Sequence, residues 1–234
     1  MNAAVVVFPG SNCDRDVIHA LEKVSLIPTR AVWHKESSLP ENTDLVVLPG
    51  GFSYGDYLRC GAMAARSPII DAVRGHAERG GLVLGICNGF QVLTETGLLP
   101  GALLANSSLE FICRRCLLRV ERNDTPFTNC FKKGEIVQFP IAHHEGLYFL
   151  PEKELSELET NGQVVFRYAA LDGSAGADQS PNGALNGIAG IVSRHGNVLG
   201  LMPHPERASE SLLGGADGLG MWTSIKSWLE GRLG

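Results

Sequence analysis

One cysteine of this chain stands where a nucleophile is well exposed to a substrate. Residues 82–86 are mostly branched and apolar, which predicts a buried strand, and residues 89–96 can form a helix directly after it. Cys87 lies on the turn between them, in the pattern Gly85-x-Cys87-x-Gly89, whose glycines permit a sharp turn. The N-terminus of the helix favours the thiolate over the thiol. The pattern therefore favours a catalytic Cys87, with a buried structural cysteine as the alternative.

A histidine and a glutamate follow another apolar run near the end of the chain. Residues 198–202 predict a strand, and His204, Pro205 and Glu206 come just after it. Pro205 keeps His204 out of the helical conformation, and in an extended chain side chains two residues apart leave the same face, roughly 7 Å apart at Cα. Glu206 can then orient one imidazole nitrogen while the other faces a nucleophile. We expect Cys87, His204 and Glu206 to act as nucleophile, base and orienting acid; the alternative is a solvated loop.

A third apolar run ends in two glycines. Residues 44–48 predict a strand, and Gly50 and Gly51 follow it. Backbone N–H groups in this turn, with that of Asn88, can form the pair of donors that an acyl-transfer oxyanion requires. Because ligands bind beyond the carboxyl ends of the strands in open α/β sheets, we expect this turn, Cys87 and His204 to meet in one crevice.

The wider context of these residues resembles a known family. P-G-G at 49–51, G-I-C-N-G-F-Q at 85–91 and M-P-H-P-E at 202–206 look like the class I (triad) glutamine amidotransferases. More narrowly, F-P-G-S-N-C-D-R-D at 8–16, G-G-F-S-Y-G-D-Y-L-R at 50–59 and P-I-A-H at 140–143 are similar to the separate glutaminase subunits of phosphoribosylformylglycinamidine synthases in purine biosynthesis. The resemblance runs from Val5 to Glu206 and beyond.

The resemblance implies a fold and an activity. The implied fold is an open, mostly parallel twisted α/β sheet of the flavodoxin-like type with helices on both faces, plus a smaller antiparallel strand region. The implied reaction is hydrolysis of L-glutamine through a thioester on Cys87, with Gly51 and Asn88 as oxyanion donors. The residues that the resemblance places around the substrate are Gly50, Phe52, Gln91 and His143. His144 stands where the family frequently has glycine, which disfavours close backbone approach there. Ser180 stands where the family usually has asparagine, so an amide contact from position 180 is lost.

The resemblance also implies partners. A large synthetase subunit would bind ATP, with Mg²⁺, and formylglycinamide ribonucleotide, and a small bridging subunit would join the assembly. This chain would supply nitrogen only, and we expect it to hold no metal and no cofactor of its own.

Composition sets the broader limits. At 234 residues, with 44% hydrophobic and 19% charged residues, we expect one globular domain over 1–234. The net charge of −5 and the absence of a dense basic run argue against nucleic-acid binding. No apolar stretch is long enough to span a membrane, and the residues before the first strand lack the pattern of a secretory signal, so we expect none. Six cysteines without a secretory context favour reduced thiols in the cytoplasm.

Apolar periodicity predicts a parallel α/β half followed by an antiparallel region. The expected strands are 3–8, 29–33, 44–48, 82–86, 117–121, 136–141 and 164–168, with a hairpin of 187–192 and 198–202. The expected helices are 14–24, capped by Ser11 or Asn12, then 68–79, 89–96 and 222–229. The histidines expected on the surface are His19, His34, His76 and His195.

Three alternatives to this function remain open. A Cys-His hydrolase or peptidase shares the same turn, and differs in releasing no ammonia from glutamine. A glutaminase subunit of another pathway differs only in its partner. A silent metal-binding or scaffold module would use Cys113, Cys116 and Cys130, and stoichiometric zinc with an unreactive Cys87 would support it. Cys13 and Cys60 have no base near them in the sequence and are expected to be structural.

Overall fold

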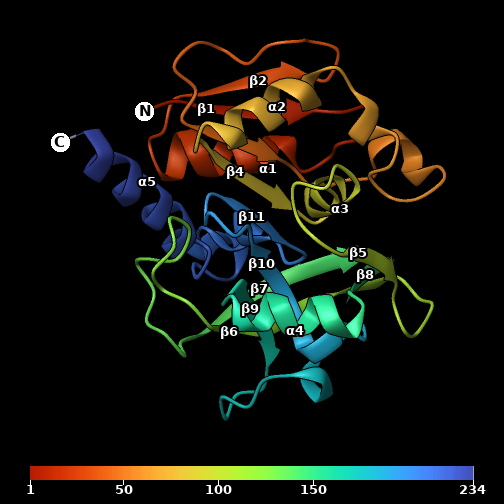
Figure 1. Ribbon diagram of the computed structural model, residues 1–234. Helices are drawn as coiled ribbons and strands as arrows, with labels where there is room; N and C mark the ends of the chain where they lie inside the picture. The colour runs from red at the N-terminus through yellow and green to blue at the C-terminus, as the bar shows by residue number, and fades with distance from the viewer. Residues whose placement is uncertain (234) are drawn as a thin grey trace.

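A nine-stranded sheet forms the centre of the computed structural model, which describes residues 1–233. Its strands are β1 Ala3–Val7, β2 Thr29–Trp33, β3 Leu45–Leu48, β4 Leu82–Ile86, β6 Ile112–Val120, β7 Ile136–His143, β9 Val164–Ala169, β10 Ile188–Val192 and β11 Val198–Leu201. Their order across the sheet is β2-β1-β3-β4-β11-β10-β9-β6-β7 (Figure 1). A separate antiparallel pair joins β5 Ala102–Ala105 to β8 Glu145–Phe149.

The first half of the sheet is parallel. β1 pairs with β2 and β3, β3 pairs with β4, and β4 pairs with β11, all in the same direction. β3 and β4 are buried along their whole length, which explains their continuous apolar sequences. The carboxyl ends of β3, β4 and β11 therefore lie at one edge of the sheet.

The second half is antiparallel. β10 and β11 form the expected hairpin, and β10, β9, β6 and β7 then pair antiparallel in turn. β7 alternates half-buried and buried residues, with His143 as its last buried position. This half brings β7 beside the segment that follows β11, where the backbone N–H of His204 donates to the Pro140 carbonyl at 2.8 Å.

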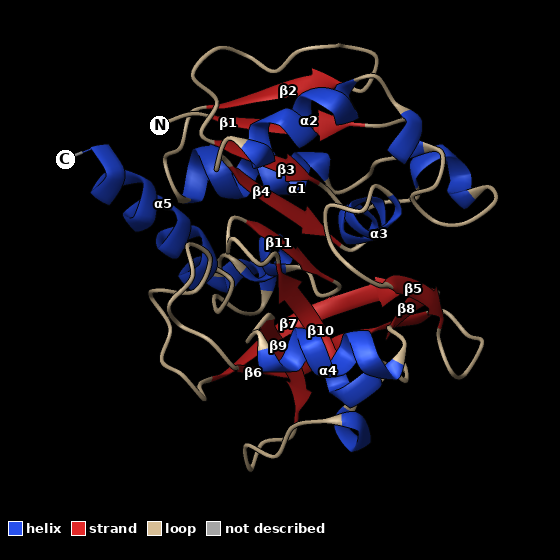
Figure 2. Ribbon diagram, viewed as in Figure 1, coloured by secondary structure: helices blue, strands red, loops and turns tan. Residues whose placement is uncertain are grey.

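Helices cover both faces of the sheet (Figure 2). They are α1 Asp14–His19, continued by a π-helical turn at Ala20–Val24, then α2 Ile69–Glu78, α3 Asn88–Glu95, α4 Glu152–Thr160 and α5 Leu219–Leu233. β1 to β2 and β3 to β4 step in opposite directions along the sheet, so right-handed crossovers place α1 and α2 on opposite faces. α3 contacts β3, β4 and β11, and so rests on the three strands whose ends carry the predicted site.

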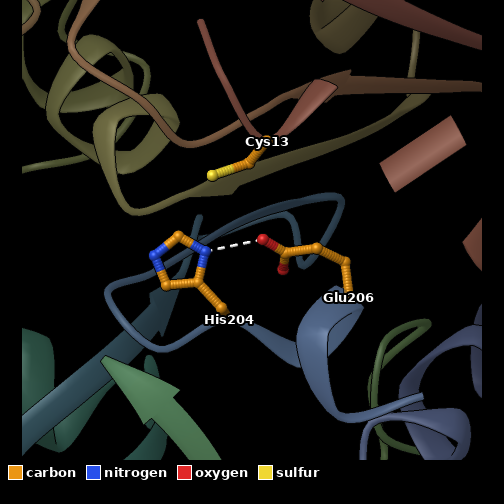
Figure 3. A group of neighbouring side chains, drawn as sticks. All are labelled: Cys13, His204 and Glu206. Atoms are coloured by element: carbon orange, nitrogen blue, oxygen red, sulfur yellow. Dashed lines mark hydrogen bonds and ion pairs between the residues drawn. The ribbon is translucent and has the colours of Figure 1, made fainter. Parts of the chain in front are cut away.

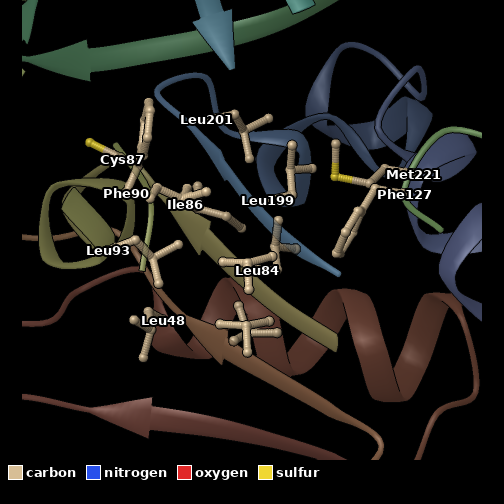
Figure 4. Close-up of a cluster of buried hydrophobic side chains, with 14 of the residues drawn as sticks. Leu48, Leu84, Ile86, Cys87, Phe90, Leu93, Phe127, Leu199, Leu201 and Met221 are labelled. Carbon is tan, nitrogen blue, oxygen red and sulfur yellow. The ribbon is translucent and has the colours of Figure 1, made fainter. Parts of the chain in front are cut away.

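The packing of α3 on the sheet explains the glycines on either side of Cys87. The apolar cluster around β4 joins Leu84 and Ile86 to Phe90 and Leu93 of α3 (Figure 4). A Cβ on Gly89 would lie 1.9 Å from the Leu48 carbonyl oxygen. A Cβ on Gly85 would lie 2.5 Å from Leu93 Cδ1 and 2.7 Å from the Gly89 carbonyl carbon, so both positions need glycine for this close contact.

Several sequence expectations need correction. β6 begins at Ile112, not at residue 117. The elements β5, β8 and α4 were not predicted, because their apolar patterns are short. In α4, for example, only Leu158 is buried. Neither Ser11 nor Asn12 caps α1, because Ser11 Oγ accepts from the Phe8 N–H instead. His34 and His76 are buried, contrary to expectation. Within residues 1–233 no helix has the length and apolar character needed to cross a bilayer.

Candidate active site

Cys87 occupies a strained turn between β4 and α3. Its backbone has φ 51° and ψ −107°, a conformation that L-residues rarely adopt outside functional turns. The backbone N–H groups of Phe90 and Gln91 donate to its carbonyl and hold the turn. The Cys87 side chain is buried, and its Sγ lies 3.8 Å from the Ala142 carbonyl oxygen of β7. The turn thus presents the thiol at the carboxyl edge of the sheet, facing the end of β7.

His204 and Glu206 form a buried hydrogen-bonded pair just beyond β11. His204 Nδ1 lies 2.6 Å from Glu206 Oε1 (Figure 3). His204 is extended, with φ −106° and ψ 90°, and a 3-10 helix at Pro205–Ala208 then carries Glu206 back toward the ring. This fixes Nδ1 as the nitrogen that contacts the carboxylate. His204 Nε2 is buried and has no hydrogen-bond partner among the described residues, so it is free to serve a substrate or a thiol.

The surroundings of His204 favour its charged form. Burial alone lowers the pKa of an imidazole, but the Glu206 carboxylate and the Cys87 sulfur outweigh it, and the pKa of His204 is raised above its ordinary value. A protonated His204 beside a cysteine is the arrangement that supplies a proton to a leaving amine.

Gly50 shows how closely Cys87 and His204 approach. A Cβ on Gly50 would lie 2.7 Å from His204 Cε1, 3.1 Å from Cys13 Sγ and 3.4 Å from Cys87 Cβ. The backbone of the Gly50 turn therefore contacts the side chains of all three residues. The three sequence motifs, which are far apart in the chain, meet at one place.

A second cysteine, Cys13, faces the same histidine, and sequence reasoning missed it. Its sulfur lies within 4.8 Å of ligand atoms of His204 and Glu206 (Figure 3). The Cys13 thiol donates to Asn12 Oδ1 at 3.1 Å, and Sγ accepts from the Arg207 guanidinium at 3.1 Å. Burial raises the pKa of Cys13. The Arg207 guanidinium acts in the opposite direction and lowers the pKa, but burial is the larger effect, and a neutral thiol is a poor nucleophile.

Two backbone N–H groups near Cys87 remain available for an oxyanion. Those of Gly51 and Asn88 have no hydrogen-bond partner among the described residues. The Asn88 side chain holds the surrounding turns together, because its Nδ2 donates to Gln91 Oε1 at 2.9 Å and its Oδ1 accepts from the Ser53 N–H at 3.3 Å. Unpaired N–H groups beside a strained cysteine are what stabilisation of a tetrahedral intermediate requires.

The residues expected around the substrate occupy different environments. Gln91 and His143 are buried, and Gln91 Nε2 donates to the Glu145 carbonyl at 2.6 Å. Phe52 is 42% exposed, with its ring 6.3 Å from that of Phe111. Gln91 and His143 thus line the interior beside Cys87, whereas the Phe52 side chain lies on the surface.

The positions that depart from the family pattern keep local hydrogen bonds. Ser180 Oγ donates to Asn182 Oδ1 at 3.0 Å, and Asn182 Nδ2 donates to the Gly146 carbonyl at 2.8 Å. His144 is exposed, and its ring nitrogen lies 3.3 Å from the Leu109 carbonyl oxygen. Asn182 therefore supports the turn between β7 and β8.

The cysteines of the metal-binding alternative do not form a ligand group among the described residues. Cys113 and Cys116 lie on β6, where their odd spacing directs them to opposite faces of the strand. Cys116 Sγ donates to the Phe139 carbonyl, and burial raises its pKa to about 12. Cys130 is exposed, and its backbone N–H donates to Ser224 Oγ. This geometry does not support a zinc site at these cysteines.

Comparison with known proteins identifies the family. Residues 1–228 match the CobB/CobQ-like glutamine amidotransferase domain. A phosphoribosylformylglycinamidine synthase subunit PurQ from Gloeobacter violaceus is 59% identical over 225 residues, 96% of this chain and 97% of that protein. PurQ from Rhodopseudomonas palustris is 55% identical and covers 98% of both chains.

Solved structures agree with this assignment. A chain of the PurLQS structure from Thermotoga maritima is 50% identical, with a TM-score of 0.86, and the match covers 97% of this chain and 98% of that one. A more distant glutamine amidotransferase from Thermotoga maritima, 16% identical with a TM-score of 0.57 over 99% of this chain and 85% of that one, shares the fold. The chain therefore belongs to the CobB/CobQ-like glutamine amidotransferase family, and within that family to the PurQ group.

Proposed function

We propose that this chain is the glutaminase component of a phosphoribosylformylglycinamidine synthase. It hydrolyses L-glutamine to glutamate and ammonia, and delivers the ammonia to a synthetase that makes formylglycinamidine ribonucleotide in purine biosynthesis. The observation that carries the proposal is the meeting of Cys87 and His204 at the Gly50 turn, at the carboxyl edge of the sheet. Sequence identity of 55–59% to PurQ subunits over nearly the whole chain supports the assignment to purine biosynthesis.

The proposed reaction follows from the positions of the side chains. The Cys87 sulfur attacks the carboxamide carbon of glutamine, and the Gly51 and Asn88 N–H groups hold the oxyanion. The carbon–nitrogen bond breaks as His204 gives its proton to the leaving nitrogen, so ammonia departs and a γ-glutamyl thioester remains. His204 then takes a proton from water, the hydroxide attacks the thioester, and glutamate leaves while Cys87 is regenerated. Glu206 keeps the imidazole oriented throughout.

Glutamine is held by the interior and by the turns around it. Gln91 and His143 contact it from the buried side, and the backbone of Gly50 and Phe52 contacts it from the turn after β3. These roles are supported by the burial of Gln91 and His143 and by the closeness of Gly50 to Cys87.

The partners follow from the relatives. The Thermotoga maritima structure is of PurLQS, and this chain acts with a large PurL-like synthetase subunit and a small bridging PurS-like subunit. ATP and Mg²⁺ belong to the synthetase, and the assembly works in the cytoplasm. The sheet runs without interruption from β2 to β7, which supports one amidotransferase domain over 1–234.

Selective labelling tests the assignment of the nucleophile. A diazoketone analogue of glutamine should alkylate Cys87 and spare the other five cysteines, as read by peptide mass spectrometry. Burial raises the pKa values of Cys13, Cys60 and Cys116, which keeps these thiols protonated. Cys113 and Cys130 are exposed, and neither belongs to the segments that carry Cys87, His204 and Glu206.

Cys13→Ala is the matched control, because Cys13 also faces His204. That variant should still be labelled at Cys87, whereas Cys87→Ala should lose all site-directed labelling. Labelling that moves to Cys13, or that persists in Cys87→Ala, would refute the assignment.

A further inference from the structure

His143 is a buried histidine whose ring nitrogen Nε2 has no hydrogen-bond partner among the described residues. It ends β7 and is only 3% exposed. Its Nε2 is buried and forms no hydrogen bond with any described residue. An unpaired buried acceptor costs about 1–3 kcal/mol, so an orphan nitrogen at this depth calls for a ligand. A Cβ on Gly146 would lie 2.2 Å from the ring, which shows how tightly the backbone clamps it.

The hydrogen bonds of Asn106 determine which nitrogen of His143 carries the proton. Asn106 Nδ2 donates to two carbonyls, those of Glu110 at 2.8 Å and His143 at 2.9 Å. Asn106 Oδ1 accepts from the Gly146 N–H at 3.1 Å. These three bonds fix the orientation of the amide, so the oxygen faces His143 Nδ1 at 3.0 Å. Only a protonated Nδ1 can donate to it, and Nε2 is therefore left with a lone pair.

The backbone on either side of His143 belongs to the wall of the candidate active site. The residue before His143, Ala142, has its carbonyl oxygen 3.8 Å from Cys87 Sγ. Two residues after His143, the Glu145 carbonyl accepts from Gln91 Nε2. The segment that carries His143 thus contacts both Cys87 and Gln91, the residue expected to hold the substrate. Burial, followed by the charge of His204, lowers the pKa of His143 to about 4, so the ring stays neutral at physiological pH.

We propose that His143 Nε2 accepts a hydrogen bond from the carboxamide NH₂ of bound glutamine, and that this contact distinguishes glutamine from glutamate. The inference rests on the proposed function. Glutamine and glutamate differ only at this group: the amide offers N–H donors, whereas the carboxylate offers only lone pairs. A fixed acceptor that cannot donate binds the first and repels the second. After hydrolysis the product carboxylate faces the same lone pair, which favours release of glutamate.

Asn106 is the positioning residue in this account. It touches no substrate, and acts by holding the His143 ring with Nδ1 protonated and Nε2 bare. When the histidine rings of the chain are labelled with ¹⁵N, the resonance of His143 Nε2 near neutral pH should lie in the range of an unprotonated ring nitrogen. Asn106→Ala should give signals from both tautomers, a change that a merely structural contact would not produce. A protonated Nε2 in the unaltered chain would overturn the proposal.

The deciding experiment uses the complex reconstituted with the synthetase. His143→Leu should raise KM for glutamine about tenfold or more while leaving the inhibition constant of glutamate unchanged or lower, so that discrimination falls by the same factor. His143→Gln should retain most of the discrimination, because its amide can donate to Asn106 and present an oxygen. Synthesis from ammonium salts should be unchanged in both variants, which verifies assembly.

The outcomes separate this inference from the proposed function. An unaltered complex that makes no product from glutamine would refute the proposed function. Suppose that the unaltered complex uses glutamine normally, and that the ratio of the glutamate inhibition constant to the KM for glutamine is unchanged in His143→Leu. That result would refute only the role of His143. Should the leucine variant fail to assemble, the glutamine variant and the tautomer measurement on the unaltered chain decide the question.

Discussion

At the scale of single residues, the site depends on a buried carboxylate that sets the charge of an imidazole. Glu206 lies 2.6 Å from His204 Nδ1 and is itself buried, so little solvent screens the pair. Because His204 has a raised pKa, it keeps its proton above the ordinary histidine value of about 6.5. The alkaline limit of glutaminase activity should therefore lie above that value, where His204 loses the proton needed by the leaving nitrogen.

Glu206→Gln tests this dependence. The substitution removes the carboxylate that raises the pKa of His204, while the burial that lowers the pKa remains. The alkaline limb of kcat/KM against pH should move to lower pH, and the rate should fall by about 10²- to 10⁴-fold. A steady-state pH profile of glutamine hydrolysis provides the measurement, with Glu210→Gln, which alters a carboxylate paired with the surface residue His19, as the control. An unshifted limb would mean that Glu206 does not set the charge of His204.

The sequence predicted the residue types at the candidate site better than their neighbours. Cys87, His204 and Glu206 stood out because each follows an apolar strand that ends at the same edge of a sheet. Cys13 gave no such signal, since its contacts with His204 and Arg207 join opposite ends of the chain. The orphan nitrogen of His143 was equally hidden, because its partner Asn106 lies on a segment whose strand the sequence did not predict.

At the scale of elements, the site is held by backbone segments that approach more closely than side chains permit. Gly50 lies against the His204 ring and Cys87, and Gly89 lies against the end of β3. Trp222 of α5 adds support from behind: its indole donates to Ser209 Oγ, which donates to the Pro205 carbonyl beside His204. The distances between catalytic groups are thus set by β3, α3 and α5 together.

Gly50→Ala should disrupt this spacing. The added methyl would lie 2.7 Å from His204 Cε1, so the ring or the turn must shift, and a displacement of about 1 Å can cost about a hundredfold in rate. Gly231→Ala is the matched control, because a Cβ at that position meets nothing within 4 Å. Glutaminase rate and thermal stability should be measured on both variants. A Gly50→Ala chain with normal activity would show that the Gly50 contact does not position His204.

Element prediction succeeded where patterns were long and failed where they were short. β2 and β4 have the expected bounds: β4 is a continuous apolar run buried at every position, whereas β2 is an edge strand in which only Val32 is buried. α4 was missed because it is a glutamate-rich surface helix with one buried residue, and β5 and β8 because they pair only with each other. The missed pair matters, since β8 begins at the turn that carries His143.

At the scale of the whole molecule, the chain is a nitrogen donor whose site is closed. Cys87 is 4% exposed and His204 2%, so glutamine reaches them only when surrounding turns move. The turn after Gly51 is the segment suited to such movement, with positive φ at Tyr54, Asp56 and Leu58 and a fully projecting Leu58 side chain. The synthetase chemistry lies on another subunit, so loss of the glutaminase should leave that chemistry intact.

The central claim is that Cys87 liberates the nitrogen which a partner synthetase incorporates. The most direct test reconstitutes the complex with Cys87→Ala and compares product formation from glutamine with that from ammonium salts in one preparation. Synthesis from glutamine should be abolished, and synthesis from ammonium should be largely intact, because added ammonia bypasses this subunit. Loss of both activities in a complex that assembles normally, or retention of glutamine-dependent synthesis, would contradict the account.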